Sequence, residues 1–234
     1  MIKGGETIEL FIPKKISSSR RLILPLRILF EDDFFAVIYK PAGILVSGNG
    51  FKTIANALEQ NLKPSNAVDT TKPQPIHRLD YATSGVLLIG KTSSSIRLLN
   101  EQFENKKVMK TYYAVTIGEM SMNGLISHDI DGKKSETTFK VCHSVLSKRF
   151  GKLNLVKLKP KSGRKHQIRK HLSGIGNPIL GDATYGDEGK ILKGKGMYLF
   201  AYSLEFLHPM TKEKLRFTAE LPKKFEKIFN INTL

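Results

Sequence analysis

Short apolar runs of strand length constrain the fold of this 234-residue chain more than any other feature. Residues 34–39 (FFAVIY) and 86–89 (VLLI) are continuous apolar runs, which is typical of strands buried on both faces. Residues 111–117 (TYYAVTI) alternate between the two faces of a strand. Further strands are predicted over residues 137–145, 153–159 and 215–221.

Helical patterns are fewer and do not alternate regularly with the strands. They cover residues 53–63, 93–103, 167–172 and 225–229. Thr53 is placed to cap the first helix, and Ser93–Ser95 to cap the second. Strands that outnumber helices without a regular βα alternation indicate an α+β fold with a mixed, largely antiparallel sheet.

The domain organisation is simple. About 30 residues precede the first confident strand, fewer than the ~40 that an independent domain usually needs. We therefore expect one domain over residues 31–234, preceded by an N-terminal extension, residues 1–30. The N-terminus lacks the pattern of a secretory signal, no apolar run reaches the ~20 residues of a membrane span, and the single cysteine, Cys142, excludes an intramolecular disulfide. These features predict a cytoplasmic protein.

The charge is strongly basic. The chain carries 38 Lys and Arg against 21 Asp and Glu, a formal net charge of +17. Residues 148–170 contain ten basic residues and no acidic one. Such a block favours a polyanionic partner, nucleic acid ahead of an anionic membrane surface.

Residues 85–92 (GVLLIGKT) fit the phosphate-loop pattern G-x-x-x-x-G-K-[ST]. In a true phosphate loop the four variable positions curl around phosphates, but here they are the apolar residues 86–89. An extended apolar run cannot do this, so we predict a strand followed by a helix start, with Lys91 as a surface or rim cation. A magnesium-dependent nucleotide hydrolase remains the alternative.

Asp80 lies just upstream, in the sequence HRLD, and it has two interpretations. It can form a local ion pair with Arg78, or it can be a reagent held in a fixed direction where residues 81–85 lead into the buried strand. The six histidines show no HExxH spacing, and His166 and His171 lie five residues apart, so we expect packing or RNA contacts and no metal site.

Five segments of the sequence then carry a family resemblance. HRLDYATSGVLLIGKT resembles the signature of the RluA family of RNA pseudouridine synthases. FEDDFFAVIYKPAGILV, KTYYAV and PKSGRKHQIRKHLSGIGNPILGDATYG resemble its other segments, with Ser162 in place of the usual threonine. FAYSLEFLHPMTKEKLRFTAELP resembles its C-terminal strand pair, so the resemblance extends over nearly the whole chain.

The resemblance implies an isomerase that converts uridine in RNA to pseudouridine, on a single catalytic domain with a central RNA-binding cleft. It implies no cofactor, no nucleotide and no metal. Asp80 would be the nucleophile, with attack at the sugar or an alternative route left open. Arg169 would keep the Asp80 carboxylate charged, and Tyr112 would stack on the uracil.

The target base must be flipped out of folded RNA. The resemblance assigns RNA contacts to six further residues: His77, Arg78, Lys110, Arg164, Lys165 and His166. Too few residues precede Glu31 for the additional N-terminal RNA-binding domain of many relatives, so residues 133–140 and 148–170 would select the RNA. The segment PKSGRKHQIRKHL is most similar to branches that modify tRNA, which favours tRNA over ribosomal RNA. We also expect a monomer. A non-catalytic RNA-binding protein on the same scaffold is the alternative.

Overall fold

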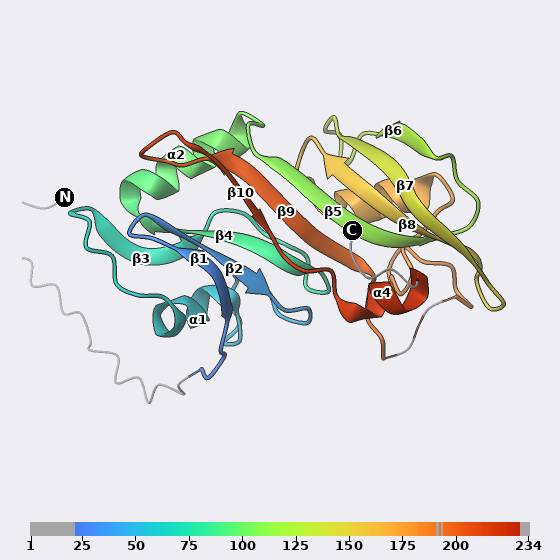
Figure 1. Cartoon of the computed structure of the whole chain (residues 1–234), viewed down its shortest axis with the longest axis horizontal. Coiled ribbons are helices and arrows are strands. Elements are labelled where there is room, and N and C mark those ends of the chain that lie inside the picture. The colour runs from blue at the N-terminus through green and yellow to red at the C-terminus, as the bar shows by residue number, and fades with distance from the viewer. Residues whose placement is uncertain (1–21, 191, 193, 230–234) are drawn as a thin grey trace, which may run out of the picture.

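The computed structural model describes residues 22–190, 192 and 194–229, which form one ten-stranded sheet with four helices (Figure 1). The strands are β1 (Arg27–Glu31), β2 (Phe35–Lys40), β3 (Thr70–Pro75), β4 (Ser84–Thr92), β5 (Met109–Ile117), β6 (Asn123–Ser127), β7 (Glu136–Ser147), β8 (Gly151–Pro160), β9 (Leu199–Leu207) and β10 (Lys214–Thr218). The helices are α1 (Ile54–Asn61), α2 (Ser93–Glu104), α3 (Gln167–Gly174) and α4 (Lys223–Phe229).

The sheet is mixed and largely antiparallel, as predicted. Its order is β1-β2-β4-β9-β5-β8-β7-β6, with β3 beside β4 and β10 beside β9. Only β4 and β9 pair in parallel, and this contact joins the two halves of the sheet. In Figure 1 one half carries α1 and α2, and the other carries α3 and α4.

The parallel contact depends on Gly85. Its φ is +126°, and a Cβ placed there would lie 2.1 Å from the carbonyl oxygen of Ala201. Only glycine permits both this conformation and this close approach. The pattern from Gly85 to Thr92 is therefore a strand in the middle of a sheet, and it cannot wrap a phosphate.

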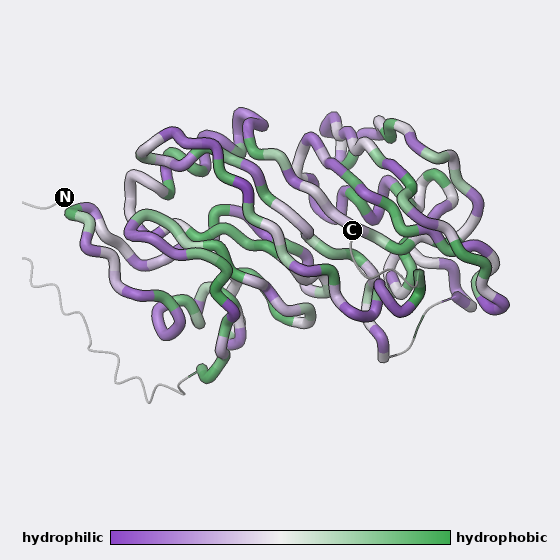
Figure 2. The backbone as a smooth tube through the Cα atoms, in the orientation of Figure 1, coloured by the Kyte–Doolittle hydropathy of each residue, from purple (hydrophilic) through white to green (hydrophobic). Residues whose placement is uncertain are grey.

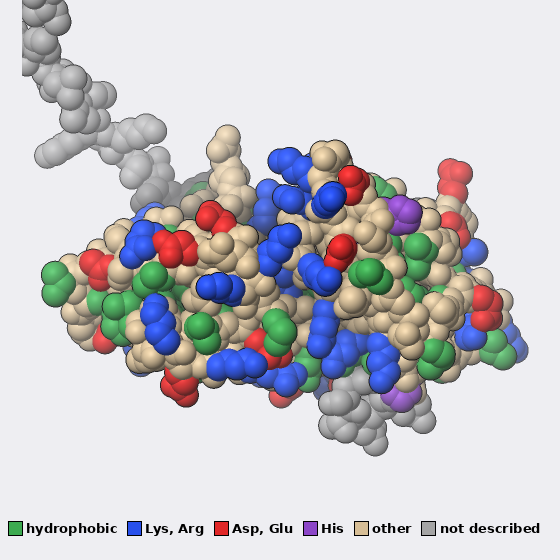
Figure 3. All heavy atoms as spheres, turned by 90° about the horizontal axis from the view of Figure 1, so that it is seen from above, with side chains coloured by type: hydrophobic (Ala, Val, Ile, Leu, Met, Phe, Trp, Pro, Cys, Tyr) green, Lys and Arg blue, Asp and Glu red, His purple; other side chains and the backbone are tan. Residues whose placement is uncertain are grey.

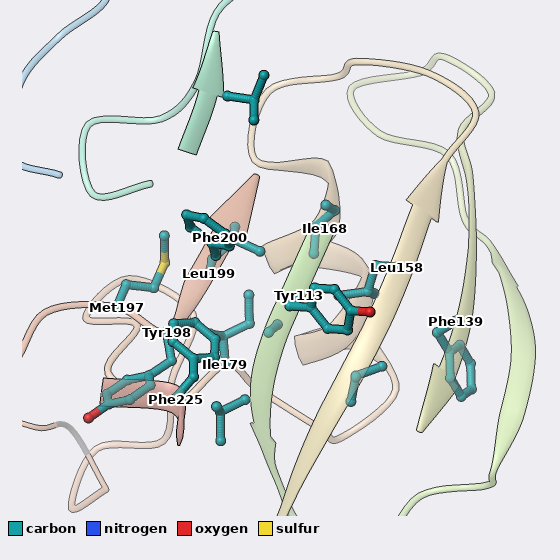
Figure 4. Close-up of a cluster of buried hydrophobic side chains, with 14 of the residues drawn as sticks. Tyr113, Phe139, Leu158, Ile168, Ile179, Met197, Tyr198, Leu199, Phe200 and Phe225 are labelled. Carbon is teal, nitrogen blue, oxygen red and sulfur yellow. The ribbon is translucent and has the colours of Figure 1, made fainter. Parts of the chain in front are cut away.

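Alternate residues of β4 pack into two separate apolar clusters, one on each face. Val86 and Leu88 join the larger cluster, whose central members are drawn in Figure 4. Leu87 and Ile89 pack into the smaller cluster with α1. Burial on both faces explains why the sequence shows a continuous apolar run here (Figure 2).

Lys91 is buried, and the prediction of a surface or rim cation is wrong. Its side chain is 3 % exposed and its Nζ lies 2.8 Å from the carboxylate of Glu31. It also donates a hydrogen bond of 2.6 Å to the carbonyl oxygen of Asp32. The lysine therefore links β4 to the end of β1, where a carboxylate and a carbonyl replace its lost water.

Two predicted boundaries are corrected. Thr53 caps α1 as predicted, but α2 is capped by Thr92, in a reciprocal pair with Ser95. The strand expected over residues 215–221 ends at Thr218.

The boundary expected between residues 30 and 31 falls inside β1. Residues 27–30 belong to the sheet, because Arg27 to Glu31 pair with β2. Residues 1–21 of the expected extension lie outside the described part of the chain. None of the described helices has the length and apolarity needed to cross a membrane.

Candidate active site

A cavity of about 560 Å³ opens where the two halves of the sheet meet. Its walls come from the loop before β4, the end of α2, the start of β5, the loop after β8, and α3. All nine site residues predicted from the sequence line it: His77, Arg78, Asp80, Lys110, Tyr112, Arg164, Lys165, His166 and Arg169. Residues up to 92 positions apart in the chain thus meet in one cavity.

Asp80 faces Arg169 across this cavity. The Arg169 Nη1 lies 3.5 Å from the Asp80 Oδ2, although the two residues are 89 positions apart. The Asp80 side chain stays 22 % exposed, which leaves it open to a substrate. Among the described residues, Arg78 forms no ion pair within 4.0 Å, so the local pairing with Asp80 is absent.

Asp182 holds the arginine and was given no role from the sequence. Arg169 Nε donates to its Oδ2 at 2.7 Å, and Arg169 Nη2 donates to its Oδ1 at 2.8 Å. The backbone N–H groups of Thr184 and Tyr185 donate to the same carboxylate at 2.9 and 3.2 Å. Asp182 could have been identified from the sequence, because it is the acidic residue after Gly181 in PILGDATYG, a segment that resembles the family.

Burial and pairing act in opposite directions on these two groups. Burial by itself lowers the pKa of Arg169, but the hydrogen bonds and charge of Asp182, followed by the charge of Asp80, raise it overall. Burial raises the pKa of the Asp182 carboxyl, but the hydrogen bonds from Arg169 and from the Thr184 N–H lower it overall. Both partners therefore remain charged at neutral pH.

His166 lies against Asp80 on the other side. Its Nε2 is 3.9 Å from the Asp80 Oδ1, and its Nδ1 shares a 3.0 Å hydrogen bond with the Tyr185 hydroxyl. Its backbone is left-handed (φ 56°) at the N-terminus of α3, where its side chain makes no capping hydrogen bond. The side chain is directed into the cavity instead. Burial lowers the pKa of His166, so the ring is neutral at pH 7.

The side chains of Tyr112 and Tyr113 point to opposite faces of β5, as expected for successive residues of a strand. Tyr112 lines the cavity, whereas Tyr113 is 5 % exposed and packs edge-on against Tyr202 on the opposite face. Burial raises the pKa of Tyr112, and the charge of Asp80 raises it further. Tyr112 is therefore a neutral phenol that can stack on a base or donate a hydrogen bond.

Lys110 anchors the loop that precedes α3. Its Nζ donates to the Ser162 carbonyl oxygen at 2.8 Å, and burial lowers its pKa to about 8. The Ser162 hydroxyl donates to the Gln167 Oε1 at 2.6 Å. Serine therefore supplies a hydroxyl where the family usually has threonine. Arg164 and Lys165 extend from this anchored loop along the cavity wall.

His77 makes structural contacts within the wall. Its Nε2 accepts a hydrogen bond of 3.2 Å from the Leu88 N–H, and its ring stacks on Phe103 at 5.0 Å. Burial, followed by the charge of Lys110, lowers its pKa to about 3. The ring is neutral at physiological pH, so any RNA contact from it would not involve a positive charge.

Lys40 holds the turn that follows Asp80 and was not identified as a site residue from the sequence. This fully buried side chain donates from Nζ to the carbonyl oxygens of Pro41 and Thr83 at 2.9 and 2.8 Å, with a longer contact of 3.4 Å to that of Tyr81. Two of these carbonyls belong to the turn that follows Asp80. Burial lowers the pKa of Lys40 to about 8, although the Asp80 charge opposes the shift.

The basic block, residues 148–170, is less uniform than its sequence indicates. In addition to Arg169, three lysines of the block pair with acids outside it: Lys152 with Glu119, Lys161 with Glu136, and Lys170 with Asp131. No group of three or more His, Cys, Asp and Glu side chains in the described part of the chain could hold a metal ion.

The cavity thus combines a carboxylate, a buried arginine and several further cations, a lining suited to an anionic ligand. The RNA pseudouridylate synthase family matches residues 34–174. The chain belongs to this family, in its RluA branch, and is an isomerase.

Relatives of both ribosomal RNA and tRNA specificity resemble the chain. Ribosomal large subunit pseudouridine synthase D of Xanthomonas campestris is 31 % identical over 98 % of this chain and 76 % of that protein. tRNA pseudouridine synthase C of Haemophilus ducreyi is 32 % identical over 88 % of this chain and 96 % of that protein. The structure of human RNA pseudouridylate synthase domain containing 1 superposes with a TM-score of 0.72 at 25 % identity, covering 89 % of each chain.

Proposed function

We propose that this enzyme isomerises a specific uridine in a structured RNA, with Asp80 as the nucleophile. The contact between Asp80 and Arg169 carries the proposal. A carboxylate under a stacked base loses water, which disfavours its charged form, and a fixed cation restores that form. Arg169 is itself fixed by Asp182, so it can serve as this cation without moving.

The proposed reaction rearranges bonds within a single nucleotide and consumes no second reactant. The bond between N1 of uracil and C1′ of the ribose breaks, the base turns, and C5 bonds to C1′. C5 loses a proton and N1 gains one, so atoms and electrons balance without a cofactor or metal. Attack by Asp80 at C1′ and a route through loss of the base both agree with this balance.

The remaining cavity residues would bind the flipped nucleotide. Tyr112 would stack on the uracil and, as a neutral phenol, donate a hydrogen bond to it. Arg78 is exposed at the rim, where it can hold the opened RNA. Arg164 and Lys165 can reach phosphates from the loop anchored by Lys110.

We favour tRNA as the substrate and ribosomal RNA as the alternative. Support comes from the segment PKSGRKHQIRKHL, whose sequence resembles that of tRNA-modifying branches. The relatives are named for both RNAs and do not favour tRNA. We propose that the enzyme acts as a cytoplasmic monomer. Comparative pseudouridine mapping of total RNA with and without this protein would identify the substrate and the modified position.

Asp80→Asn tests the role of the carboxylate. We expect pseudouridine formation to be abolished in single-turnover assays while RNA affinity changes little, because the side chain keeps its size. Asp187→Asn, which removes an exposed carboxylate paired only with Lys190, is the matched control and should leave the rate unchanged. Activity of Asp80→Asn within tenfold of wild type would exclude the nucleophile role.

A further inference from the structure

Three lysines lie together on the face of the sheet that points away from the cavity. Thr137 of β7 hydrogen-bonds to Gln167 and His171 of α3, which fixes its side chain on the cavity face. Successive strand residues point to opposite faces, so Lys140, three positions further along, points away. In the strand register Lys157 of β8 lies directly opposite Lys140.

The neighbouring strand confirms this orientation. Lys157 also lies opposite Tyr113 of β5, and Leu158 lies opposite the cavity residue Tyr112. Figure 4 shows Tyr113 and Leu158 beside β8. Lys159, two positions beyond Lys157, shares its face at a spacing of about 6.6–6.8 Å along the strand. These three residues are called the lysine row below.

The lysine row lacks acidic partners. Within the described part of the chain, no carboxylate lies within 4.0 Å of Lys140, Lys157 or Lys159, although other lysines of the same basic block are paired. Like charges placed directly opposite each other across two strands are destabilising. The fold therefore places uncompensated positive charge on this face, where a bound polyanion would relieve it.

The lysine row continues toward the cavity. Beyond Lys159, Lys161 is both a member of the cavity lining and the partner of Glu136. Lys161 follows directly after the end of β8 at Pro160, so the lysine row leads from Lys159 to a cation of the cavity lining. Figure 3 shows Lys and Arg side chains gathered in a band across the middle of the molecule, from one edge of this view to the other.

We propose that the lysine row is a second RNA contact surface, which holds the phosphate backbone of the strand that flanks the target uridine. The cavity takes the flipped nucleotide, and the flanking strand passes the rim at Lys161 to the opposite face of the sheet. Contacts of this kind position the RNA without reading its sequence. The inference rests on RNA being the substrate of the proposed function.

A charge-neutralising triple variant tests the surface. Lys140→Gln, Lys157→Gln and Lys159→Gln are combined and compared with a matched triple, Lys52→Gln, Lys63→Gln and Lys72→Gln. The control lysines are exposed, lie outside the cavity lining and carry the same total charge. Lys72 has an exposed partner, Glu59, at 3.5 Å, and such a surface pair contributes little to stability. The dissociation constant for full-length tRNA transcript is measured between 50 and 300 mM salt.

Each lost phosphate contact lowers the slope of log K against log salt by roughly 0.7–0.9. The lysine-row variant should therefore lose about 2–3 from the slope and bind roughly tenfold or more weakly at low salt, with the deficit shrinking as salt rises. The control triple should keep the wild-type slope. A wild-type slope in the lysine-row variant, or an equal loss in both triples, would overturn the proposal.

Two further readouts separate this surface from catalysis. At saturating RNA the single-turnover rate of the lysine-row variant should equal that of wild type, because Asp80 and its partners are untouched. A short stem-loop that fills only the cavity should bind wild type and variant equally, and a clear difference on it would contradict the proposal. If the wild type forms no pseudouridine, the proposed function is wrong. The salt dependence of RNA binding still tests whether the lysine row binds RNA, because it does not depend on catalysis.

Discussion

Asp182 grips Arg169 through two parallel hydrogen bonds of 2.7 and 2.8 Å, and the third guanidinium nitrogen is left facing Asp80. The planar fork of arginine makes this possible, because two nitrogens match one carboxylate while the other projects in a fixed direction. Arg169 is 7 % exposed, so its desolvation is offset mainly by Asp182. Asp182, which is not part of the cavity lining, therefore orients the guanidinium of Arg169 toward Asp80.

Asp182→Asn should reduce the rate more than RNA affinity. The amide accepts one hydrogen bond from Arg169, but its NH2 group faces donors, so the guanidinium loses its fixed direction. We expect the single-turnover rate to fall by roughly tenfold to a hundredfold, since small misplacements are costly in catalysis. Filter binding should show a dissociation constant within about threefold of wild type. An unchanged rate in a folded variant would refute the orienting role.

His166 and Tyr185 should act as one unit on Asp80. Tyr185→Phe removes the 3.0 Å hydrogen bond to the imidazole, and His166→Gln removes the ring that lies 3.9 Å from the carboxylate. We expect each single variant to slow the reaction, and the double variant to be no slower than His166→Gln alone. Single-turnover rates of all four proteins complete the cycle, and additive losses would show that the two residues act independently.

Lys40 should make the stability of the protein depend on pH above neutrality. Its pKa is about 8 in the folded protein, against the ordinary lysine value of 10.5, so the unfolded chain holds this proton more tightly. Its contribution to the free energy of unfolding therefore rises as the pH increases from about 8 toward 10.5. Lys110 shifts in the same direction and contributes a parallel rise.

Lys40→Met tests this dependence by denaturant titration at pH 7.5, 8.5 and 9.5. The variant should be less stable at every pH, because the carbonyls of Pro41 and Thr83 lose their donor. Its stability should also rise less steeply with pH than that of wild type. Parallel pH curves for the two proteins would show that Lys40 is not the titrating group.

Lys91→Met should impair folding and leave the chemistry intact. Removing the lysine leaves the Glu31 carboxylate, which is 12 % exposed, without its partner, at a cost of about 3–5 kcal/mol. The double variant Lys91→Met, Glu31→Gln should recover most of this loss. Pseudouridine formation by the folded fraction should match wild type.

Local patterns in the sequence predicted six of the strands and all four helices that the structure describes, but β1, β3 and β6 were missed and β9 was identified only through the family resemblance. The runs at residues 34–39 and 86–89 became β2 and β4, because strands buried on both faces have apolar side chains at every position. The resemblance also identified nine residues that meet in one cavity. Their chemistry depends on residue type and local context, both of which the sequence carries.

Long-range charge pairing could not be predicted in this way. Lys91 has the local context of a surface cation, and only the pairing of β1, β2 and β4 brings it to Glu31. The same holds for Asp182 with Arg169 and for Lys40 beneath the turn after Asp80. The sequence by itself determined which groups are present and which strands form. The tertiary structure decided which charges lose water and which partner replaces it, because desolvation depends on chain segments far apart in sequence.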